Sequence, residues 1–528
     1  MKQRITYVVH NPDDFDPSQL RLSTKDAFTL DSVNAAKEHR LTFGLSELPQ
    51  ELYRVLRQCH ELHIRWASEK YYTSIPPYVS RISPGLHAFF TPHKGSLADL
   101  LCPMLKKVFG YNLKCESLKD TFIGMPILSE RFSMSSAFQY YQFLPSLKDL
   151  VTYIQQKICA TSDPSCQTQA ASLLSATYVD IDFDTISHAL VFNGFWDRAP
   201  DAESWTETIP LRQKTDHIEV GVLTSEKAVD PEDLAFSGFL TVIGKDSKPS
   251  PTRFSFPARH HPLPSSAQST PPLTYTTSFR HPTGLHPTLL LTFPSASLIP
   301  PDETCALHTY LTLPAALFID RYQLSDPLFL SSLHLTSLRS LSGATDLEAP
   351  IWVVPEWGSA ALLELAVPAS SPPSSSSSAS KQDAAAAWTV QIPLHLRYLP
   401  PNRNASGLEA VAAPWPVVFW ACRGEEGAKM AASPFDRVNL GYEGLFGPKT
   451  MFYHVPPANS SSGGRLVEEI QVPVLDLDQA WYVEWGTVVA VALGTLWVCW
   501  KLFGIMRRDV VAAKKVEGKG EGEGKKMQ

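Results

Sequence analysis

One apolar stretch near the C-terminus constrains this 528-residue chain more than any other feature. The residues from Trp485 to Trp500 include no charged side chain, and Glu484 and Lys501 lie at the two edges. These 16 residues are somewhat fewer than the roughly 20 that an α-helix needs to cross a bilayer core, but the lysine side chain can extend to the headgroups. Aromatic rings at both ends, including Trp497, fit the depth of the interface. We therefore expect one transmembrane helix over 481–503, rather than the buried core helix of a soluble domain.

The charges on the two sides of this span predict its orientation. The basic flank of a membrane helix stays in the cytoplasm, and here the basic side chains follow the span while acidic ones dominate the approach. We therefore expect the residues before the span to be lumenal and residues 504–528 to form a short cytoplasmic tail, whose low-complexity end is disordered. Two N-glycosylation sequons before the span, at Asn404 and Asn459, favour the same orientation. The flanking charges are Lys501, Arg507, Arg508, Lys514 and Lys515 after the span, and Glu468, Glu469, Asp476, Asp478 and Glu484 before it.

The N-terminus keeps a second orientation open. Its only apolar stretch, Ile5 to Val9, is far shorter than the apolar region of a signal peptide, so no cleavable leader is predicted. A protein whose single span lies near its C-terminus can instead be tail-anchored, with the large region in the cytosol. A tail-anchored cytosolic adaptor therefore remains an alternative.

The net charge argues against a nucleic-acid-binding protein, and the proline content argues against a mainly helical one. The 46 Lys and Arg residues are outnumbered by 53 Asp and Glu residues, so the net charge of −7 provides no positive field for a nucleic-acid backbone. Nucleic acid is not an expected partner. The 43 prolines outnumber the 27 glycines, which indicates many extended or turning segments and few helices.

Alternation of apolar and polar residues predicts a mainly-β fold. Ile218, Val220 and Val222 alternate with polar residues, as do the apolar positions of 391–398, which is the pattern of strands with one buried face. The best soluble helices are 49–56 and 146–159, and Pro103 interrupts a third candidate over 97–108. We expect β-sandwich-like lumenal domains with a few helices, plus the C-terminal transmembrane helix.

Two segments rich in Pro and Ser divide the chain. Residues 246–272 are nearly free of aliphatic side chains and are interpreted as a linker between domains 1–245 and 273–480. Residues 368–387 lie between strand-like segments and are interpreted as a disordered surface loop. His260 and His261 fall in the linker, where a mobile pair would make a poor catalyst.

Eight cysteines in so long a chain do not make a disulfide scaffold. Cys499 lies in the span, and the others show neither a C-x-x-C motif nor a zinc-site spacing, so no metal is predicted. Cys305 and Cys422 form the one pair available between the linker and the span. Whether they form a disulfide or remain two buried thiols stays open.

Candidate catalytic motifs are weak. Asp180, Asp182 and Asp184 alternate onto one strand face, where carboxylates can hold a divalent cation and a nucleotide diphosphate, as in glycosyltransferases. A solvated strand face explains the same pattern. His60 and His63 miss metalloprotease spacing by one residue, and Pro448 removes an N–H that the phosphate loop suggested by 447–450 would need. The chain is predicted to be an accessory subunit, with no catalytic, cofactor-binding or metal-binding residues.

Four segments of the C-terminal half resemble the PIG-X family, whose fungal members are the PBN proteins. Two segments of the N-terminal half, 48–52 and 81–87, are similar to the fungal version. The four segments are Leu317–Pro327, Gly343–Pro350, His395–Pro400, and Phe435–Arg437 with Gly441–Lys449.

The resemblance implies a single-span glycoprotein of the endoplasmic reticulum membrane that takes part in GPI-anchor biosynthesis. Such a protein stabilises the multi-span, PIG-M-like catalytic subunit of GPI mannosyltransferase I, which adds the first mannose from dolichol-phosphate mannose. The family supplies no catalytic residues. The link of its fungal members to a vacuolar protease is interpreted as an indirect, chaperone-like effect.

Two contacts with the partner follow as hypotheses. Gly486 and Gly494, eight residues apart in the span, would let a partner helix approach closely. Arg397 lies on a polar strand face beside the matched segments, where it either binds the partner or joins a local ion pair, and we favour the ion pair.

Overall fold

The computed structural model describes most of the chain: residues 2–23, 27–95, 98–126, 137–160, 162–200, 203–211, 216–264, 273–294, 298–347, 349–368, 387–403, 407–425, 430, 433–435, 440–459 and 464–523. These divide into two compact units. The larger contains residues 1–398 and 411–470, and the smaller contains residues 399–410 and 471–528. Strands predominate over helices, so the prediction of a mainly-β fold is confirmed.

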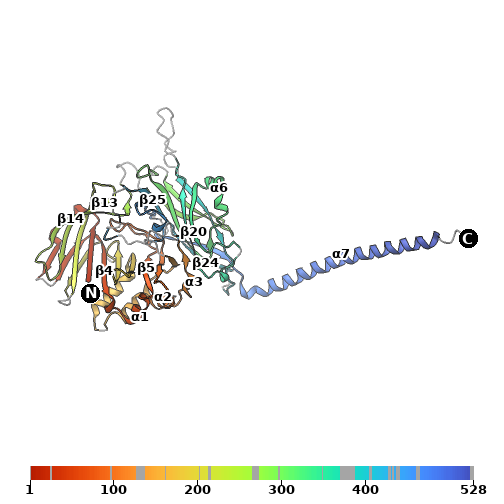
Figure 1. Cartoon of the computed structure of the whole chain (residues 1–528), viewed down its shortest axis with the longest axis horizontal. Helices are drawn as coiled ribbons and strands as arrows, with labels where there is room; N and C mark the ends of the chain where they lie inside the picture. The colour runs from red at the N-terminus through yellow and green to blue at the C-terminus, as the bar shows by residue number, and fades with distance from the viewer. Residues whose placement is uncertain are drawn as a thin grey trace, which may run out of the picture. The chain divides into compact units, whose positions relative to one another are not determined.

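A broad sheet forms the N-terminal half of the larger unit (Figure 1). Within the described residues it has eleven strands, all antiparallel to their neighbours except the parallel pair β1 and β12. Ile218, Val220 and Val222 of β12 are buried, as their alternation predicts. The strands, in spatial order, are β14 (Ser250–Pro257), β13 (Asp233–Val242), β12 (His217–Glu226), β1 (Lys2–Val9), β4 (Ala35–Gly44), β10 (Ala189–Trp196), β9 (Tyr178–Asp184), β5 (Cys59–Ala67), β6 (Gly85–Pro92), β8 (Phe138–Gln142) and β7 (Ile123–Gly124).

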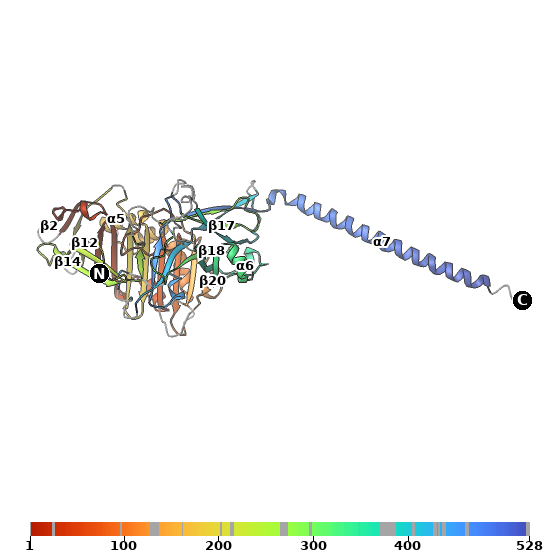
Figure 2. The ribbon, with the colours of Figure 1, turned by 90° about the horizontal axis from the view of Figure 1, so that it is seen from above.

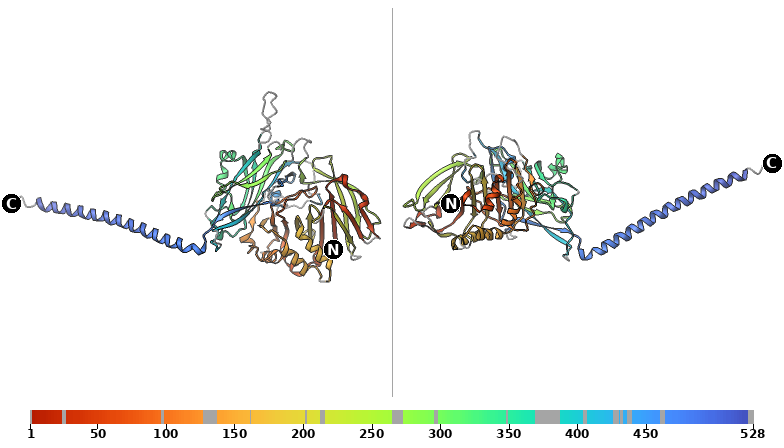
Figure 3. Two further views of the ribbon diagram at one scale, coloured as in Figure 1. Left: turned by 180° about the vertical axis from the view of Figure 1, so that it is seen from behind. Right: turned by 60° about the horizontal axis from the view of Figure 1, so that its bottom comes forward.

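Several helices cover part of this sheet (Figure 3). They are α1 (Gln50–Leu56), α2 (Leu101–Phe109), α4 (Lys148–Lys157) and α5 (Pro164–Ser172), with a short α3 (Leu118–Thr121) nearby in sequence. The helices predicted over 49–56 and 146–159 are confirmed by α1 and α4. The interruption predicted at Pro103 was wrong, because α2 begins at Leu101 and places the proline in its first turn, where the backbone N–H has no helical partner to lose.

Smaller sheets build the C-terminal half of the larger unit. Among the described residues, β15 (His260–Pro262), β26 (Thr450–Val455), β25 (Val417–Arg423), β18 (Ala306–Pro314), β21 (Gly358–Leu365) and β20 (Leu335–Gly343) form one sheet in that order. A second sheet contains β16 (Thr276–Phe279), β17 (Thr288–Pro294) and β22 (Ala387–Pro393). A third sheet, from the N-terminal half, contains β11 (Trp205–Pro210), β3 (Ala27–Val33) and β2 (Leu20–Ser23). The other described strands form the pairs β19 (Leu317–Phe318) with β23 (His395–Leu396) and β24 (Leu408–Pro414) with β27 (Val467–Pro473), and α6 (Pro327–Ser332) precedes β20.

The segment interpreted as a linker is largely ordered. Strand β14 and strand β15 both lie within 246–272, and only 265–272 falls outside the described residues. His260 and His261, expected to be mobile, are 1% and 3% exposed. The interpretation of 246–272 as a linker was therefore wrong where β14 and β15 lie. The composition of this segment does not reveal the distant strands that pack against it. Residues 369–386, within the loop expected at 368–387, also lie outside the described residues.

The two halves of the larger unit share one hydrophobic core. Tyr442 is fully buried, and its hydroxyl donates to the carbonyl oxygen of Arg81 at 2.9 Å. Gln139 of β8 makes the same connection twice: its side-chain oxygen accepts from the Tyr310 hydroxyl at 3.1 Å, and its carbonyl oxygen accepts from the Trp357 indole at 2.8 Å. Each bond satisfies a polar atom that burial would otherwise leave unpaired. The two halves are therefore held together by buried side chains and buried hydrogen bonds.

A buried carboxylate next to Tyr442 ties two distant segments together. His260 Nε2 lies 2.6 Å from Glu443 Oε1, and the Leu440 N–H donates to Glu443 Oε2 at 2.6 Å. Burial alone would raise the pKa of Glu443, but the hydrogen bond from His260, the positive charges of His260 and Arg259, and the Leu440 N–H together hold it below its ordinary value. The carboxylate is therefore ionised in the folded chain.

Replacing this carboxylate tests its contribution. We expect Glu443→Gln to lower the free energy of unfolding by about 3 kcal/mol, because the buried His260 imidazole and the Leu440 N–H lose a charged acceptor. The folded-state pKa of Glu443 is depressed, so the difference is full above the unfolded pKa and shrinks as pH falls through the folded value. Thermal unfolding of the full chain in detergent, followed across pH, measures both effects. The exposed Glu469→Gln is the matched control, and equal unfolding midpoints for the two variants would contradict the assignment.

The smaller unit contains one long helix, α7 (Ala480–Glu523) (Figure 2). Its part within Leu477–Arg508 is long and apolar enough to cross a membrane. The predicted C-terminal apolar helix is confirmed by length and composition. The helix also continues past residue 503 to Glu523, so residues 518–523 of the low-complexity end, which we expected to be disordered, are helical. The Ala and Lys residues of 512–515 favour helix over coil.

Candidate functional site

The three aspartates of β9 have separate structural roles. Asp180 is buried and accepts two hydrogen bonds from the Arg65 guanidinium, at 2.6 and 2.7 Å. Asp182 Oδ1 lies 3.6 Å from His63 Nδ1, and Asp184 accepts the backbone N–H groups of 186 and 187 at 2.8 and 2.7 Å, which closes the turn after the strand. A metal-nucleotide site needs carboxylates that converge on open space. The geometry here serves the fold instead.

The other weak motifs also lie apart or are occupied. His60 is exposed, with Nδ1 3.0 Å from Thr185 Oγ1, whereas His63 is fully buried on the same strand. Residues three apart on a strand face opposite sides, so the two imidazoles share no ligand position. The carbonyl oxygen of Gly447, in the loop that resembled a phosphate cradle, accepts a hydrogen bond from Arg259 at 3.2 Å.

The cysteines are more extensively paired than the sequence indicated. Cys305 and Cys422 form a disulfide, the pairing that the sequence left open. Two further disulfides, Cys102–Cys115 and Cys159–Cys166, were missed. Their short sequence separations of 13 and 7 residues were the available signal.

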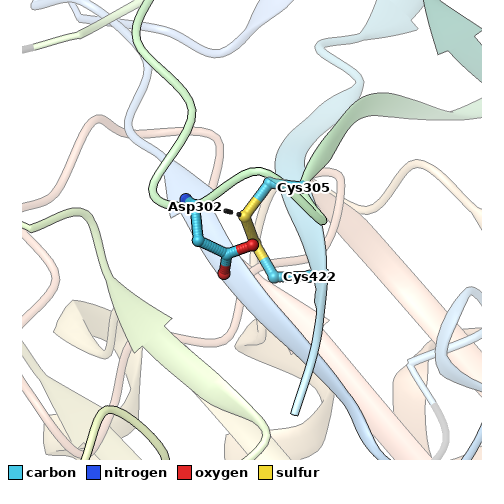
Figure 4. A group of neighbouring side chains, drawn as sticks. All are labelled: Asp302, Cys305 and Cys422. Atoms are coloured by element: carbon cyan, nitrogen blue, oxygen red, sulfur yellow. Dashed lines mark hydrogen bonds between the residues drawn. A yellow bond between two sulfur atoms is a disulfide. The ribbon is translucent and has the colours of Figure 1, made fainter.

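Asp302 lies beside the Cys305–Cys422 disulfide (Figure 4). Its N–H donates to Cys305 Sγ at 3.3 Å. Three such residues could hold a metal ion only if both sulfurs were thiolates. Because the sulfurs are bonded to each other, this group is structural.

The described membrane residues, and one of the two predicted glycosylation asparagines, are exposed. Asn459 is exposed just after β26, while Asn404 lies outside the described residues. Trp485, Trp497 and Trp500 are 62%, 59% and 70% exposed on α7. An added Cβ at Gly486 or Gly494 would meet nothing within 4 Å, so the helix side that carries these glycines is open within the chain.

Arg397 brings three of the segments that carry the family resemblance into one place. Its guanidinium donates to the carbonyl oxygens of Asp346 at 2.5 Å, Ala349 at 2.7 Å and Ala344 at 3.3 Å. It also lies over the Phe318 ring, 4.2 Å from the centroid, where strands β19 and β23 pair. The side chain is only 2% exposed. Arg397 therefore holds a loop by its backbone and, being buried, is not an accessible partner contact. The local ion pair that we favoured stays a prediction.

An exposed apolar patch lies beside this buried arginine. It consists of Trp352, Val353 and Tyr398, which are 61%, 57% and 67% exposed, and we call it the 352/398 patch. The N–H of Ile351 donates to the carbonyl oxygen of Tyr398 at 3.1 Å, so the two segments that carry the patch are hydrogen-bonded to each other. Large aromatic residues on a fixed backbone are typical of binding hot spots. Sequence patterns did not find this patch, because its members lie in irregular segments.

Comparison with known proteins decides the family. A sequence model of the PIG-X / PBN1 family matches residues 282–503. "Protein pbn1" of Emericella nidulans is 51% identical, with 96% of this chain and 97% of that protein covered. The protein of the same name from Neurospora crassa is 41% identical, with 98% and 100% covered. The chain belongs to the PIG-X / PBN1 family. Membership in this family supports an accessory role in GPI-anchor biosynthesis.

Some of the candidate sites lie inside the segment that the PIG-X / PBN1 model matches, and others lie outside it. The matched residues include Arg397, the 352/398 patch, Glu443 and the apolar part of α7 up to residue 503. Strand β15, with His260, precedes them. The full-length fungal relatives, by contrast, also cover the eleven-stranded sheet and its helices, so the whole larger unit is common to this branch of the family.

Removing the hydrogen-bond donors of Arg397 tests its role. We expect Arg397→Met, which keeps the length of the apolar stem, to lower the free energy of unfolding by about 2 kcal/mol, because three carbonyl oxygens lose their shared donor. The amides of 344–347 should exchange with deuterium faster. The exposed Arg321→Met is the control and should change stability by less than about 0.5 kcal/mol. Unchanged exchange in 344–347 would show that the loop is held by other contacts.

Proposed function

We propose that this chain is the non-catalytic subunit that stabilises the multi-span, PIG-M-like catalytic subunit of the dolichol-phosphate-mannose-dependent GPI mannosyltransferase I in the endoplasmic reticulum membrane. The observation that carries the proposal is the 352/398 patch, which lies within the family match and is supported from inside by Arg397. A partner that binds only the folded state of a marginally stable protein raises its stability by mass action. A chaperone-like effect on other proteins would then be indirect. It would arise where the folding of those proteins depends on GPI-anchored proteins.

The charged residues of the larger unit support a role without catalysis. Two buried pairs of polar side chains, Arg65 with Asp180 and His260 with Glu443, are hydrogen-bonded to each other. Active sites instead keep perturbed groups in a cleft that substrate can reach. In this subunit the buried charges fix the shape of the fold, and the apolar surface is available for a partner.

The lumenal orientation is supported by the disulfides. Three pairs of cysteines are bonded within the described residues, and structural disulfides form in oxidising compartments such as the lumen of the endoplasmic reticulum. The exposed position of Asn459 and the basic residues after the span favour the same side. The tail-anchored alternative would place all three disulfides in a reducing cytosol.

The anchor helix provides a second contact with the partner. In lipid, association of helices depends on close packing, which small residues allow. Gly486 and Gly494 are open to such an approach. The 352/398 patch and this helix side would then engage the partner's lumenal loops and membrane helices, respectively.

Glycosylation tests the orientation. We expect the full chain in microsomes to migrate faster after endoglycosidase treatment, because sequons are modified only in the lumen. Asn404→Gln and Asn459→Gln should each remove one step of the shift, and the double variant should remove all of it. A wild-type chain without any shift, whose large region is digested by protease added outside intact microsomes, would contradict the lumenal orientation.

Charge placed in the 352/398 patch tests the partner contact. We expect Trp352→Glu with Tyr398→Glu to weaken co-purification of the catalytic subunit by at least about 30-fold, since even one hot-spot aromatic residue contributes about 2 kcal/mol or more. The abundance of the catalytic subunit should fall with it. Quantitative immunoprecipitation and blotting measure both.

Two controls accompany this experiment. Tyr111→Glu alters an aromatic side chain that is 82% exposed and outside the family match, and it should leave co-purification unchanged. Gly486→Leu with Gly494→Leu tests the helix contact separately. Normal abundance of the catalytic subunit after depletion of this chain would refute the proposed function altogether.

A further inference from the structure

A large cavity lies between the broad sheet and the helices that cover it, with a volume of about 390 Å³. Its floor includes Ile181 of β9 and Phe192 of β10. Its walls include Leu52 of α1, Met104 and Leu105 of α2, and Ile154 of α4. The volume lies within the range of about 300–1,000 Å³ that is typical of ligand sites.

The chemistry of the lining selects the kind of ligand. Aliphatic and aromatic side chains make up most of it, and the described lining residues include no lysine or arginine. The charged residues that line it are Glu47 and Asp163, both acidic and both at least partly exposed. Such a site offers water too few hydrogen-bond partners, and its described lining provides no lysine or arginine to bind an anionic headgroup. It therefore suits hydrocarbon, with any polar end of the ligand outside.

The surrounding contacts keep the cavity from closing. Protein interiors are usually packed without voids of this size, and a void persists only where the walls cannot collapse. Glu51 of α1 accepts hydrogen bonds from Tyr153 of α4, at 2.7 Å, and from Lys107 of α2. The Cys102–Cys115 disulfide holds the start of α2, and Cys159–Cys166 joins the end of α4 to α5. Four helices are thus fixed to one another around an unfilled apolar space.

The cavity also has access from outside. Ile158, which lines it after α4, is 40% exposed, and Met104 and Ile154 are half-buried. These side chains are apolar, so the entrance does not require a chain to cross a charged barrier. A flexible hydrocarbon chain could enter there and leave its head in solvent.

We propose that this cavity binds a single hydrocarbon chain of a membrane lipid, either a fatty acyl chain or a polyprenyl chain. The chain fills the space between α1, α2, α4 and the sheet, and its polar end stays outside. This site lies outside the family match at 282–503 and goes beyond the stabilising role, on which it does not depend. An apolar peptide segment is the competing occupant.

Photo-crosslinking of the full chain in nanodiscs tests the site. Diazirine-labelled palmitate and a diazirine-labelled polyprenol are added separately, and the labelled peptides are identified by mass spectrometry. We expect labelling in the peptides that carry α2 and α4, and an excess of the matching unlabelled chain should abolish it. The probe that labels more strongly identifies the source of the chain. Labelling of neither helix, or labelling that the excess does not reduce, would overturn the proposal.

Variants that fill the cavity provide the second arm. Met104→Trp and Ile154→Trp should each reduce labelling at least ten-fold, whereas Leu100→Trp, at a position on the same helix's N-cap that does not line the cavity, should leave it unchanged. Equal labelling of Met104→Trp and Leu100→Trp would refute the site. So would finding that an apolar peptide, and not the lipid probe, occupies the cavity. If the filled variants fail to fold, the competition experiment on the natural chain decides alone.

Discussion

The burial of Glu443 against His260 is the contact on which the larger unit depends most. Removing a carboxylate from water is costly unless charges and donors replace the water, and here an imidazole, a guanidinium and a backbone N–H do so. These groups come from β15 and from the loop before β26, which are far apart in the sequence. The neighbouring Tyr442 extends the same junction to Arg81 in the N-terminal half. The junction can therefore form only when both halves have folded.

Arg397 and Arg65 show how this molecule uses buried cations. Each guanidinium is almost fully buried, but one serves three carbonyl oxygens of an irregular loop and the other serves one carboxylate of a neighbouring strand. A planar group with several donors can hold backbone that has no regular ladder. This explains how an irregular segment can present Trp352 and Tyr398 on a fixed backbone, which a binding surface needs.

The sequence predicted the features that depend on local pattern. Alternation identified β12 and β9, the apolar run identified α7, and the segments of the family resemblance include those that Arg397 joins. The sequence did not predict that β14 and β15 are ordered strands. The residues that bury His260 lie more than 180 positions away, so no local pattern reveals them. The cavity and the 352/398 patch were also missed. Both are formed by side chains that folding brings together from distant positions. Neither produces a regular spacing of residue types that could be recognised in the sequence.

The parallel pairing of β1 with β12 has a consequence for how the chain is made. Lys2 pairs with His217, so the first strand synthesised stays without its second neighbour until more than two hundred residues have followed. During that interval β1 is an open edge, and open edges attract other strands. During synthesis the chain therefore leaves one side of β1 open for longer than a strand whose two neighbours are close in the sequence.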